Sequence, residues 1–216
     1  AISETSNITE LSLVAARAFR DLIGYDRVML YKFDDDGHGQ ITGEARDPRL
    51  ESLLGHRYPA SDIPQRAREL YISNRVRVLV DASYVPAAIV STQTGFDAQQ
   101  IDMSMCYLRS MSPLHLQYLQ NMGVTATLVV SLVRHGKLWG LVAAHHDTQR
   151  NVSFAIRSAA QLLAEAVCTR LAGIENYAQA RVAIQVRRLE RRLIESTSSE
   201  GDWKLALFRN PNTLLQ

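Results

Sequence analysis

The fold is decided by residues 124–146, which read VTATLVVSLVRHGKLWGLVAAHH. Two runs rich in β-branched and other apolar residues, 124–133 and 137–145, are separated only by the tripeptide RHG at 134–136. A short connection that contains glycine between two such runs is typical of a β-hairpin. The stretch therefore predicts two strands that pair antiparallel.

The N-terminal part of the chain predicts a helix followed by a second hairpin. Apolar residues recur at helical spacing over 8–23, and Gly24 ends this helix. The segment 25–33, YDRVMLYKF, alternates and is rich in strand formers, and the cluster DDDGHG at 34–39 leads to a strand near 40–45. The candidate N-terminal caps of the helix are Ser6, Asn7 and Thr9.

The middle of the chain predicts two further helices and one strand between long loops. Residues 59–73 are interpreted as a short helix after a proline-bounded loop, and residues 77–80 as a strand. Residues 83–104 are polar and loop-like, and residues 108–122 show a helical pattern that Gly123 ends. The expected cap of the first of these helices is Asp62, and Pro113 lies near the start of the second.

The C-terminal part predicts one long helix from residue 154 to about residue 195, broken only at Gly173. This length exceeds that of a normal globular helix, which favours a connector or a dimer helix, with the charged stretch 187–192 as a solvated flank. Apolar character resumes over 203–215, as if another domain begins there.

The order of these elements and the composition bound the class of protein. Hairpins and excursions join the strands in place of regular β-α-β units, which predicts an α+β fold with an antiparallel sheet and helices on a face. Hydrophobic residues make up 46% and charged residues 21%, as in ordinary globular proteins. The net charge of +2 excludes a strongly basic nucleic-acid scaffold, and no apolar run is long enough for a membrane span.

The two cysteines, Cys106 and Cys168, cannot form a disulfide framework, and they favour a cytoplasmic protein. Because the chain begins at Ala1 without a signal pattern, we expect a processed product or a fragment. The motifs GxxxxGK[ST], GxGxxG, HExxH and GxSxG are absent, so we expect no enzymatic activity of this chain and no metal. His145 and His146 would point to opposite faces of a strand, one inward and one solvated.

Several residues have both a functional and a structural interpretation. Two prolines fix the backbone around Asp62, which presents its carboxylate rigidly to a ligand or only caps a helix. Arg77 and Arg109 suit two carboxylates of a ligand if they face one cavity, and otherwise make surface salt bridges. His115 and the tyrosines are more often core or surface residues than ligand contacts. The residues alone indicate an α+β ligand-binding or sensor domain.

Four stretches together resemble the chromophore-binding GAF domain of phytochromes, in that family's order across roughly residues 10–172. The words PASDIP and SPxHLxYLxNMGV are specific to phytochromes among GAF domains. The stretches are YDRVMLYKF (25–33), HRYPASDIP (56–64), LRSMSPLHLQYLQNMGV (108–124) and LWGLVAAHH (138–146). The resemblance implies a GAF domain over 1–172, a long connecting helix over 173–198 and the beginning of a PHY-like domain over 199–216.

The resemblance implies a bound linear tetrapyrrole (bilin), most specifically biliverdin. Asp62 and His115 would lie beside the pyrrole nitrogens, and His145 would bond the carbonyl of the terminal ring. Arg77 and Arg109 would pair with the propionates. The other implied contacts are Tyr71 and Thr127 as hydroxyl donors, Tyr31, Tyr58 and Tyr118 as aromatic walls, and Met29 and Ile63.

Leu114 stands where phytochromes that attach bilin within this domain have a cysteine. In this respect the chain resembles bacterial phytochromes, which attach bilin through a cysteine in an upstream PAS segment. We therefore expect no attachment residue within this chain. Noncovalent binding and an empty pocket are the alternatives.

The resemblance implies a photosensory module of a red/far-red light receptor, which signals by bilin isomerisation to a C-terminal output module, often a histidine kinase. The implied partners are a second copy, through the long helices, and a response regulator of the full-length protein. Neither nucleic acid nor membrane is expected to bind. The alternative function is a GAF domain that has lost its pigment or senses another small molecule, acting in regulation or dimerisation.

Overall fold

The computed structural model describes residues 1–92, 95, 97, 101–107 and 109–200. Within them, contacts divide the chain into a first compact unit, Ala1–Leu171, and a second that begins at Ala172. The long helix α4 (Phe154–Glu200) starts in the first unit, and it continues through Gly173, where the sequence predicted a break. Of the expected beginning of another domain over 199–216, residues 199 and 200 belong to α4, and the rest lies outside the described residues.

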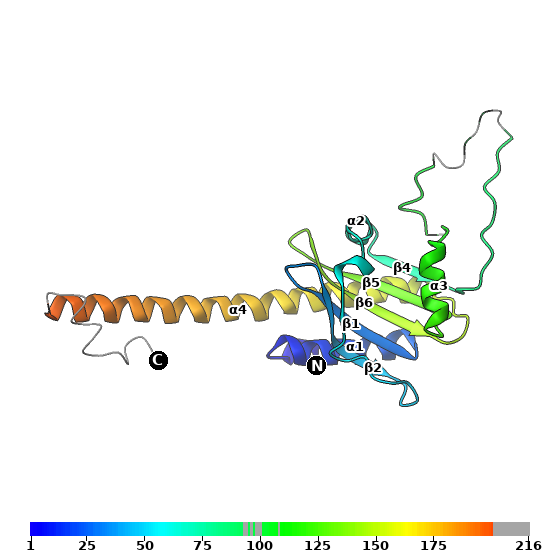
Figure 1. Cartoon of the computed structure of the whole chain (residues 1–216). Helices are drawn as coiled ribbons and strands as arrows, with labels where there is room; N and C mark the ends of the chain where they lie inside the picture. The colour runs from blue at the N-terminus through cyan, green and yellow to red at the C-terminus, as the bar shows by residue number, and fades with distance from the viewer. Residues whose placement is uncertain (93–94, 96, 98–100, 108, 201–216) are drawn as a thin grey trace. The chain divides into compact units, whose positions relative to one another are not determined.

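A six-stranded sheet forms the centre of the first unit (Figure 1). Every pairing in it is antiparallel, in the order β3-β2-β1-β6-β5-β4, which confirms the predicted α+β class with its antiparallel sheet. The strands are β1 (Arg27–Phe33), β2 (Gly39–Arg46), β3 (Arg57–Tyr58), β4 (Val76–Leu79), β5 (Ala126–Arg134) and β6 (Lys137–His146). The two-residue strand β3 is too short for any sequence pattern to reveal.

The hairpin predicted from residues 124–146 is the β5–β6 pair. His135 and Gly136 at its turn both have positive φ, 48° and 74°. Two consecutive residues of positive φ give the turn the twist that flanking strands require. This hairpin places β6 beside β1 and so joins the two halves of the sheet.

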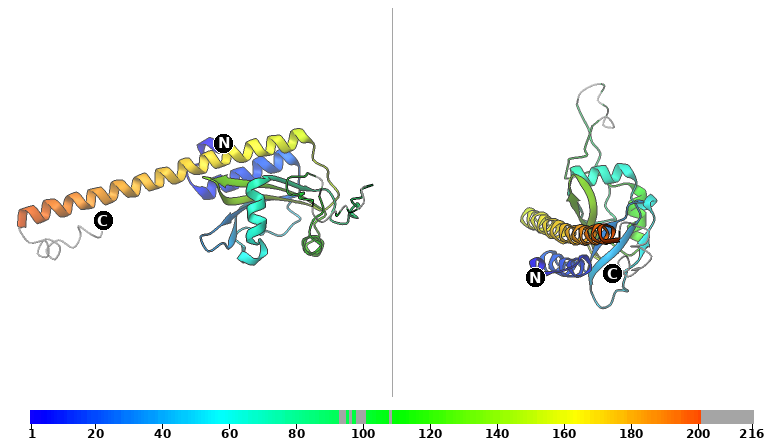
Figure 2. Two further views of the ribbon diagram at one scale, coloured as in Figure 1. Left: turned by 90° about the horizontal axis from the view of Figure 1, so that it is seen from above. Right: turned by 90° about the vertical axis from the view of Figure 1, so that its left-hand side faces the viewer.

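One face of the sheet, the α1 face, is covered by α1 (Ile8–Ile23) and the first turns of α4 (Figure 2). Asn7 caps α1 by accepting a hydrogen bond from the Glu10 amide at 2.9 Å, and Gly24 ends the helix with φ of 66°. The predicted helix bounds and stop are therefore confirmed. The Arg170 side chain of α4 donates to the Thr5 carbonyl beside the start of α1.

The alternation of side chains between the two faces is interrupted at one point in strand β2. Its register against β1 shifts after Leu30, so Ile41 is opposite Tyr31 but Gly43 is opposite Leu30. Gly43 faces α1, because a Cβ there would lie 2.3 Å from the Ser12 carbonyl oxygen. This irregularity lets a glycine meet the backbone of α1 while Ile41 stays on the opposite face.

The opposite face, the α2 face, carries a smaller core of Met29, Tyr31, Ile41 and Leu141. Three short helices lie over it or at its end: η2 (Ala60–Asp62), α2 (Gln65–Ser73) and α3 (Pro113–Asn121). The α3 helix is anchored by Leu119, which is 1% exposed and packs with Leu79 and Val124.

Two predicted helices are corrected by the structure. Residues 59–73 form η2 and α2, because Pro64 interrupts them and serves as the N-cap residue of α2, so Asp62 caps neither. The helix predicted over 108–122 starts only at Pro113, because a proline is accommodated in the first turn of a helix but not in its interior. No helix among the described residues is long and apolar enough to cross a membrane.

Candidate functional site

The strand register places four predicted site residues on the α2 face. Met29 of β1 is opposite Ala143, Ala143 is opposite Val129, and Val129 is opposite Arg77 of β4. Directly paired residues of neighbouring strands share a face, so these residues form one row across the sheet. The neighbouring row on the same face runs through Arg27, His145, Thr127 and Leu79.

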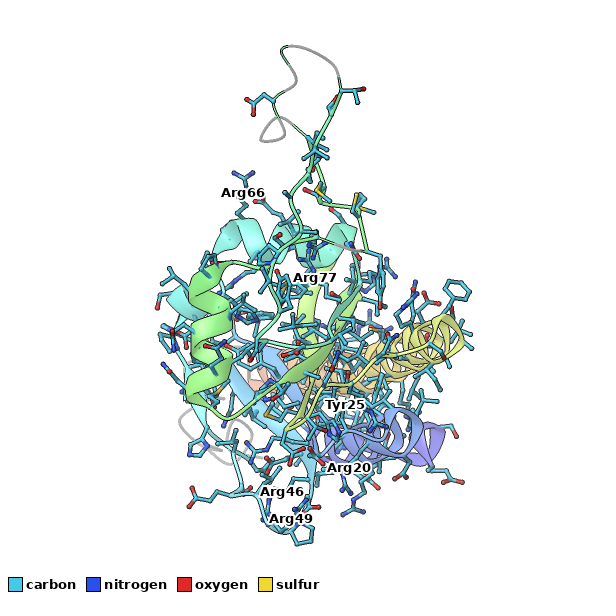
Figure 3. All side chains as sticks on the ribbon, turned by 90° about the vertical axis from the view of Figure 1, so that its right-hand side faces the viewer. Arg20, Tyr25, Arg46, Arg49, Arg66 and Arg77 are labelled. Carbon is cyan, nitrogen blue, oxygen red and sulfur yellow. The ribbon has the colours of Figure 1, made fainter. Side chains whose placement is uncertain are left out.

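Arg77 and Arg109 meet at a cavity of about 90 Å³ at the β4 edge of the sheet. The cavity is also lined by Asn74, Cys106, Tyr107 and Met111. Figure 3 shows Arg77 inside the domain, whereas Arg66 projects from its surface. The interpretation of both arginines as surface salt bridges is wrong, because among the described residues neither forms an ion pair with a carboxylate.

The Arg77 guanidinium is held in an electrostatically unfavourable place. Its Nε and Nη2 atoms are buried without a hydrogen-bond partner in the described part of the chain, and its guanidinium carbon lies 4.7 Å from the centre of the Tyr71 ring. Burial, followed by the positive charge of Arg109, lowers the pKa of Arg77. Buried unpaired donors on a cation cost free energy, so the site favours an anion that accepts from them.

Tyr71 and Arg109 surround the Arg77 guanidinium at the cavity. Burial raises the pKa of Tyr71, while the two arginines act in the opposite direction. The Nη1 atom of Arg109 donates to the carbonyls of Ser104 at 3.0 Å and Cys106 at 3.3 Å. A carboxylate between two guanidiniums would form charge-assisted hydrogen bonds, which are about twice as strong as neutral ones.

A second cluster gathers Asp62 with three of the predicted tyrosines. Burial, followed by the negative charge of Asp62, raises the pKa of Tyr31 to about 12. The pKa values of Tyr58 and Tyr118 are also raised, first by burial, and Asp62 contributes to each. Tyr31 and Tyr58 have ring centres 6.0 Å apart, and Ile63 packs against the same small core. The exposed Asp62 carboxylate therefore borders an aromatic wall.

Arg68, which the sequence reasoning missed, holds the segment that presents Asp62. Its Nε donates to the Ile63 carbonyl at 2.7 Å, and its Nη2 donates to the carbonyls of Ala60 at 3.1 Å and Gly37 at 2.6 Å. Its guanidinium lies 4.6 Å from the centre of the Phe33 ring. One side chain thus ties η2 to the β1–β2 turn. An arginine shortly after a proline-bounded loop was the only signal for it.

The two predicted histidines of the site lie near each other and favour the neutral form. The pKa of His145 is lowered to about 4 by burial, then by the charges of Arg27 and His115. Partial burial also lowers the pKa of His115, whose ring stacks on Tyr118 at 6.4 Å. A neutral imidazole carries one donor and one acceptor, so both can serve a polar ligand.

His146 points to the opposite face, as expected, but it is not solvated. Its side chain is 13% exposed and its Nδ1 lies 2.6 Å from the Asp26 carboxylate. Arg150 approaches its Nε2 at 3.4 Å. Asp26, His146 and Asp147 lie close enough together to hold a metal ion, but the Arg150 guanidinium opposes a cation there.

The remaining predicted positions divide into two kinds. Thr127 is 4% exposed on the α2 face, whereas Leu114 projects from the first turn of α3 and is 83% exposed. The sequence reasoning also missed Ser131, which lies on the same face and whose buried hydroxyl has no hydrogen-bond partner among the residues that the structure describes. A serine within an apolar strand gave no pattern that distinguished it.

The profile of the GAF domain family matches residues 7–174 of this chain. The chain belongs to the GAF domain family. Its relatives include a bacteriophytochrome of Xanthomonas campestris pv. campestris, 42% identical over 89% of the chain, and cyanobacterial phytochrome B of Nostoc, 40% identical over 97%. These matches confirm the resemblance to phytochromes. The chain spans 30% and 28% of the two relatives, respectively.

Solved phytochrome structures share the fold of this GAF domain. The photosensory core module of Stigmatella aurantiaca phytochrome matches with a TM-score of 0.88 and 35% identity, over 99% of this chain and 42% of that one. The chromophore-binding domain of an unusual bacteriophytochrome from R. palustris matches with a TM-score of 0.76 and 35% identity, over 82% of this chain and 58% of that one.

Proposed function

We propose that this GAF domain binds a linear tetrapyrrole, specifically biliverdin, and acts as the light-sensing module of a bacteriophytochrome-like receptor. One observation carries the proposal: half-buried Arg77 has two buried nitrogens without a hydrogen-bond partner among the described residues, and it lines the same cavity as Arg109. Two guanidiniums fit the two propionate carboxylates of a bilin. The names of the phytochrome relatives support the same ligand class.

The other residues of the α2 face fit the rest of such a ligand. Tyr31, Tyr58 and Tyr118 would enclose a planar ring by aromatic contact. Neutral His145 can donate to a ring carbonyl, and His115 can bond a pyrrole nitrogen directly or through water. The Asp62 segment supplies a carboxylate and backbone carbonyls, which stabilise a cationic tetrapyrrole.

A bound bilin would supply light absorption and isomerisation of a double bond. The chain's own residues would hold its propionates at Arg77 and Arg109 and let the ring beside Tyr31 and Tyr118 turn. We propose that the resulting change passes into α4 and onward to an output module, with a second copy paired through α4 and a response regulator as partners. In this proposal the chain works in the cytoplasm as a sensor, not as an enzyme.

The test is an absorption spectrum of the purified chain with biliverdin, before and after red light. A red band that changes under red light is the expected result. The Arg77→Gln variant should weaken biliverdin binding, and Arg66→Gln, on the exposed face of α2, serves as the matched control. Absence of any red band, here and in a version extended upstream, would favour the alternative of a pigment-free GAF domain.

Zinc-induced fluorescence on a denaturing gel tests how the pigment is held. Leu114 cannot form a thioether, so we expect no covalent adduct at that position. An adduct in this chain would have to involve Cys106 or Cys168, since these are its two cysteines. Biliverdin that is lost on denaturation would support noncovalent binding by this chain.

A further inference from the structure

The cavity lined by Arg77 and Arg109 is the proposed carboxylate site. Residues 101–107 and Arg109, here called the Arg109 arm, bound it on one side and form neither helix nor strand. Within it, Ser104 donates its amide to the Asp102 carboxylate at 2.9 Å, and Cys106 donates to the Met103 carbonyl at 2.9 Å. These two contacts are local to the segment. One long-range contact, from the Asn74 side-chain amide to the Ser104 carbonyl at 3.2 Å, joins the segment to the residues just before β4.

Arg77 and Arg109 line the same cavity, so their like charges repel each other. After burial, this repulsion is the second cause that lowers the pKa of Arg77. A segment that carries a cation is repelled by a like charge unless other contacts hold it. The hydrogen bonds of Arg109 to Ser104 and Cys106, and that of Asn74 to Ser104, hold the Arg109 arm at the β4 edge, and a further contact at its other side would oppose the repulsion. Arg77 itself is fixed by its strand, where it is opposite Val129.

Tyr107 supplies a contact that reaches from this arm to α4. The Arg157 guanidinium lies 3.9 Å from the centre of the Tyr107 ring, a close cation–π geometry. Arg157 is itself fixed in the first turn of α4, where its Nη1 donates to the Val152 carbonyl at 3.0 Å. Tyr107 also lines the arginine cavity, so the same ring touches the anchor and the site.

We infer that Tyr107 and Arg157 are a positioning pair that holds Arg109 facing Arg77 and so sets the affinity of the site for carboxylates. The inference rests on the proposed function, because the carboxylates in question are the bilin propionates. The pair preorganises the site, since the cost of bringing two cations together is met by the fold before the ligand arrives. It also connects the propionate site directly to the first turn of α4.

The test compares biliverdin, which has two free propionates, with its dimethyl ester, which has none. Titration by absorbance would give both dissociation constants for the unaltered chain and for Tyr107→Leu. We expect this variant to bind the free acid about 5-fold more weakly, within the range of a cation–π contact, and the ester unchanged. Tyr107→Phe should bind like the unaltered chain, because it keeps the ring.

Two further variants sharpen the test. Arg157→Gln should reproduce the effect of Tyr107→Leu, and the double variant should bind the acid no more weakly than either single variant. Tyr177→Leu is the matched control, because it removes another exposed tyrosine from the chain, one on α4.

The failures are distinguishable. If Tyr107→Leu weakens acid and ester equally, or neither, then the pair does not position Arg109 and the inference is overturned while the proposed function stands. If the unaltered chain binds neither compound, or binds the acid no better than the ester, the carboxylate site itself is wrong. That result would overturn the proposed role of the arginines together with the inference.

Discussion

The α1 face and the α2 face of the sheet differ in what they bury. On the α1 face, Val28, Leu30, Leu128, Val130 and Val142 are at most 1% exposed and apolar. On the α2 face, Thr127 and Ser131 are buried beside Arg77 and His145. Within the described ranges, the hydroxyl of Ser131 and two nitrogens of Arg77 lack hydrogen-bond partners. Because successive side chains of a strand point to opposite faces, the same strands supply an apolar core on one face and polar groups on the other. The α1 face supplies stability, and the α2 face bears polar groups that a ligand can satisfy.

The largest expected effect comes from the α1 face. Phe19 of α1 is fully buried, so Phe19→Ala should lower the free energy of unfolding by about 3–5 kcal/mol, through lost burial and a cavity. Chemical denaturation would measure this loss. Leu162→Ala, at a position 67% exposed on α4, is the control. Equal losses in the two variants would contradict the assignment of the stabilising core.

The next effect is a pH dependence that originates on the α2 face. His145 has a pKa of about 4 in the folded chain against 6.5 for the free side chain. Between these values the unfolded chain binds the extra proton, so stability is complete above about pH 6.5 and falls towards pH 4. The loss is at most about 3 kcal/mol. In chemical denaturation, His145→Gln should make the midpoint less dependent on pH over this range, whereas His56→Gln, at an exposed position, should leave the pH dependence unchanged.

Arg68 gives an intermediate effect. Arg68→Met removes the donor for three carbonyls, and it should lower the free energy of unfolding by about 2 kcal/mol. Because two of those carbonyls flank Asp62, the variant should also weaken biliverdin binding more than its stability loss alone explains. Arg66→Met, on the exposed side of α2, should change neither quantity. Unaltered binding would show that Arg68 does not position Asp62.

The smallest effect has the opposite sign. Arg77→Met replaces a partly unpaired buried cation by an apolar side chain of similar length, and it should raise the ligand-free stability by about 1 kcal/mol. The same change should abolish the preference for biliverdin over its dimethyl ester. A variant that is both less stable and still selective would contradict the contrast between the two faces.

The sequence was sufficient to predict elements that are determined by interactions between residues close together in the chain. The α1 helix, with Gly24 at its end, and the β5–β6 turn follow from residues adjacent in the chain. The helices predicted over 59–73 and 108–122 were started several residues too early, because Pro64 and Pro113 fix where α2 and α3 begin, and Asp62 is therefore not a cap. The approximate place of most candidate residues came from the phytochrome resemblance, not from periodicity.

Long-range contacts were beyond sequence reasoning. Arg68 reaches Gly37, and Tyr107 reaches Arg157, across large separations in the chain. The pattern of an arginine in the sequence does not reveal which carbonyls or rings surround it. The same holds for His146, which was expected to be solvated but pairs with Asp26.

The irregularity in β2 has a consequence for how this strand tolerates change. Gly39 and Ile41 lie on the α2 face, and a Cβ at Gly39 would overlap the Tyr31 ring, 1.7 Å from its Cζ. Gly43 lies on the α1 face instead, although it too is odd-numbered. The strand is therefore two half-strands of opposite parity joined near Thr42. A regular strand that kept Thr42 would put Ile41 and Gly43 on one face, so that either Tyr31 or α1 would lose the glycine that admits it. Deleting Thr42 would instead make Ile41 and Gly43 neighbours, which a regular strand places on opposite faces, so both glycines would keep their present faces.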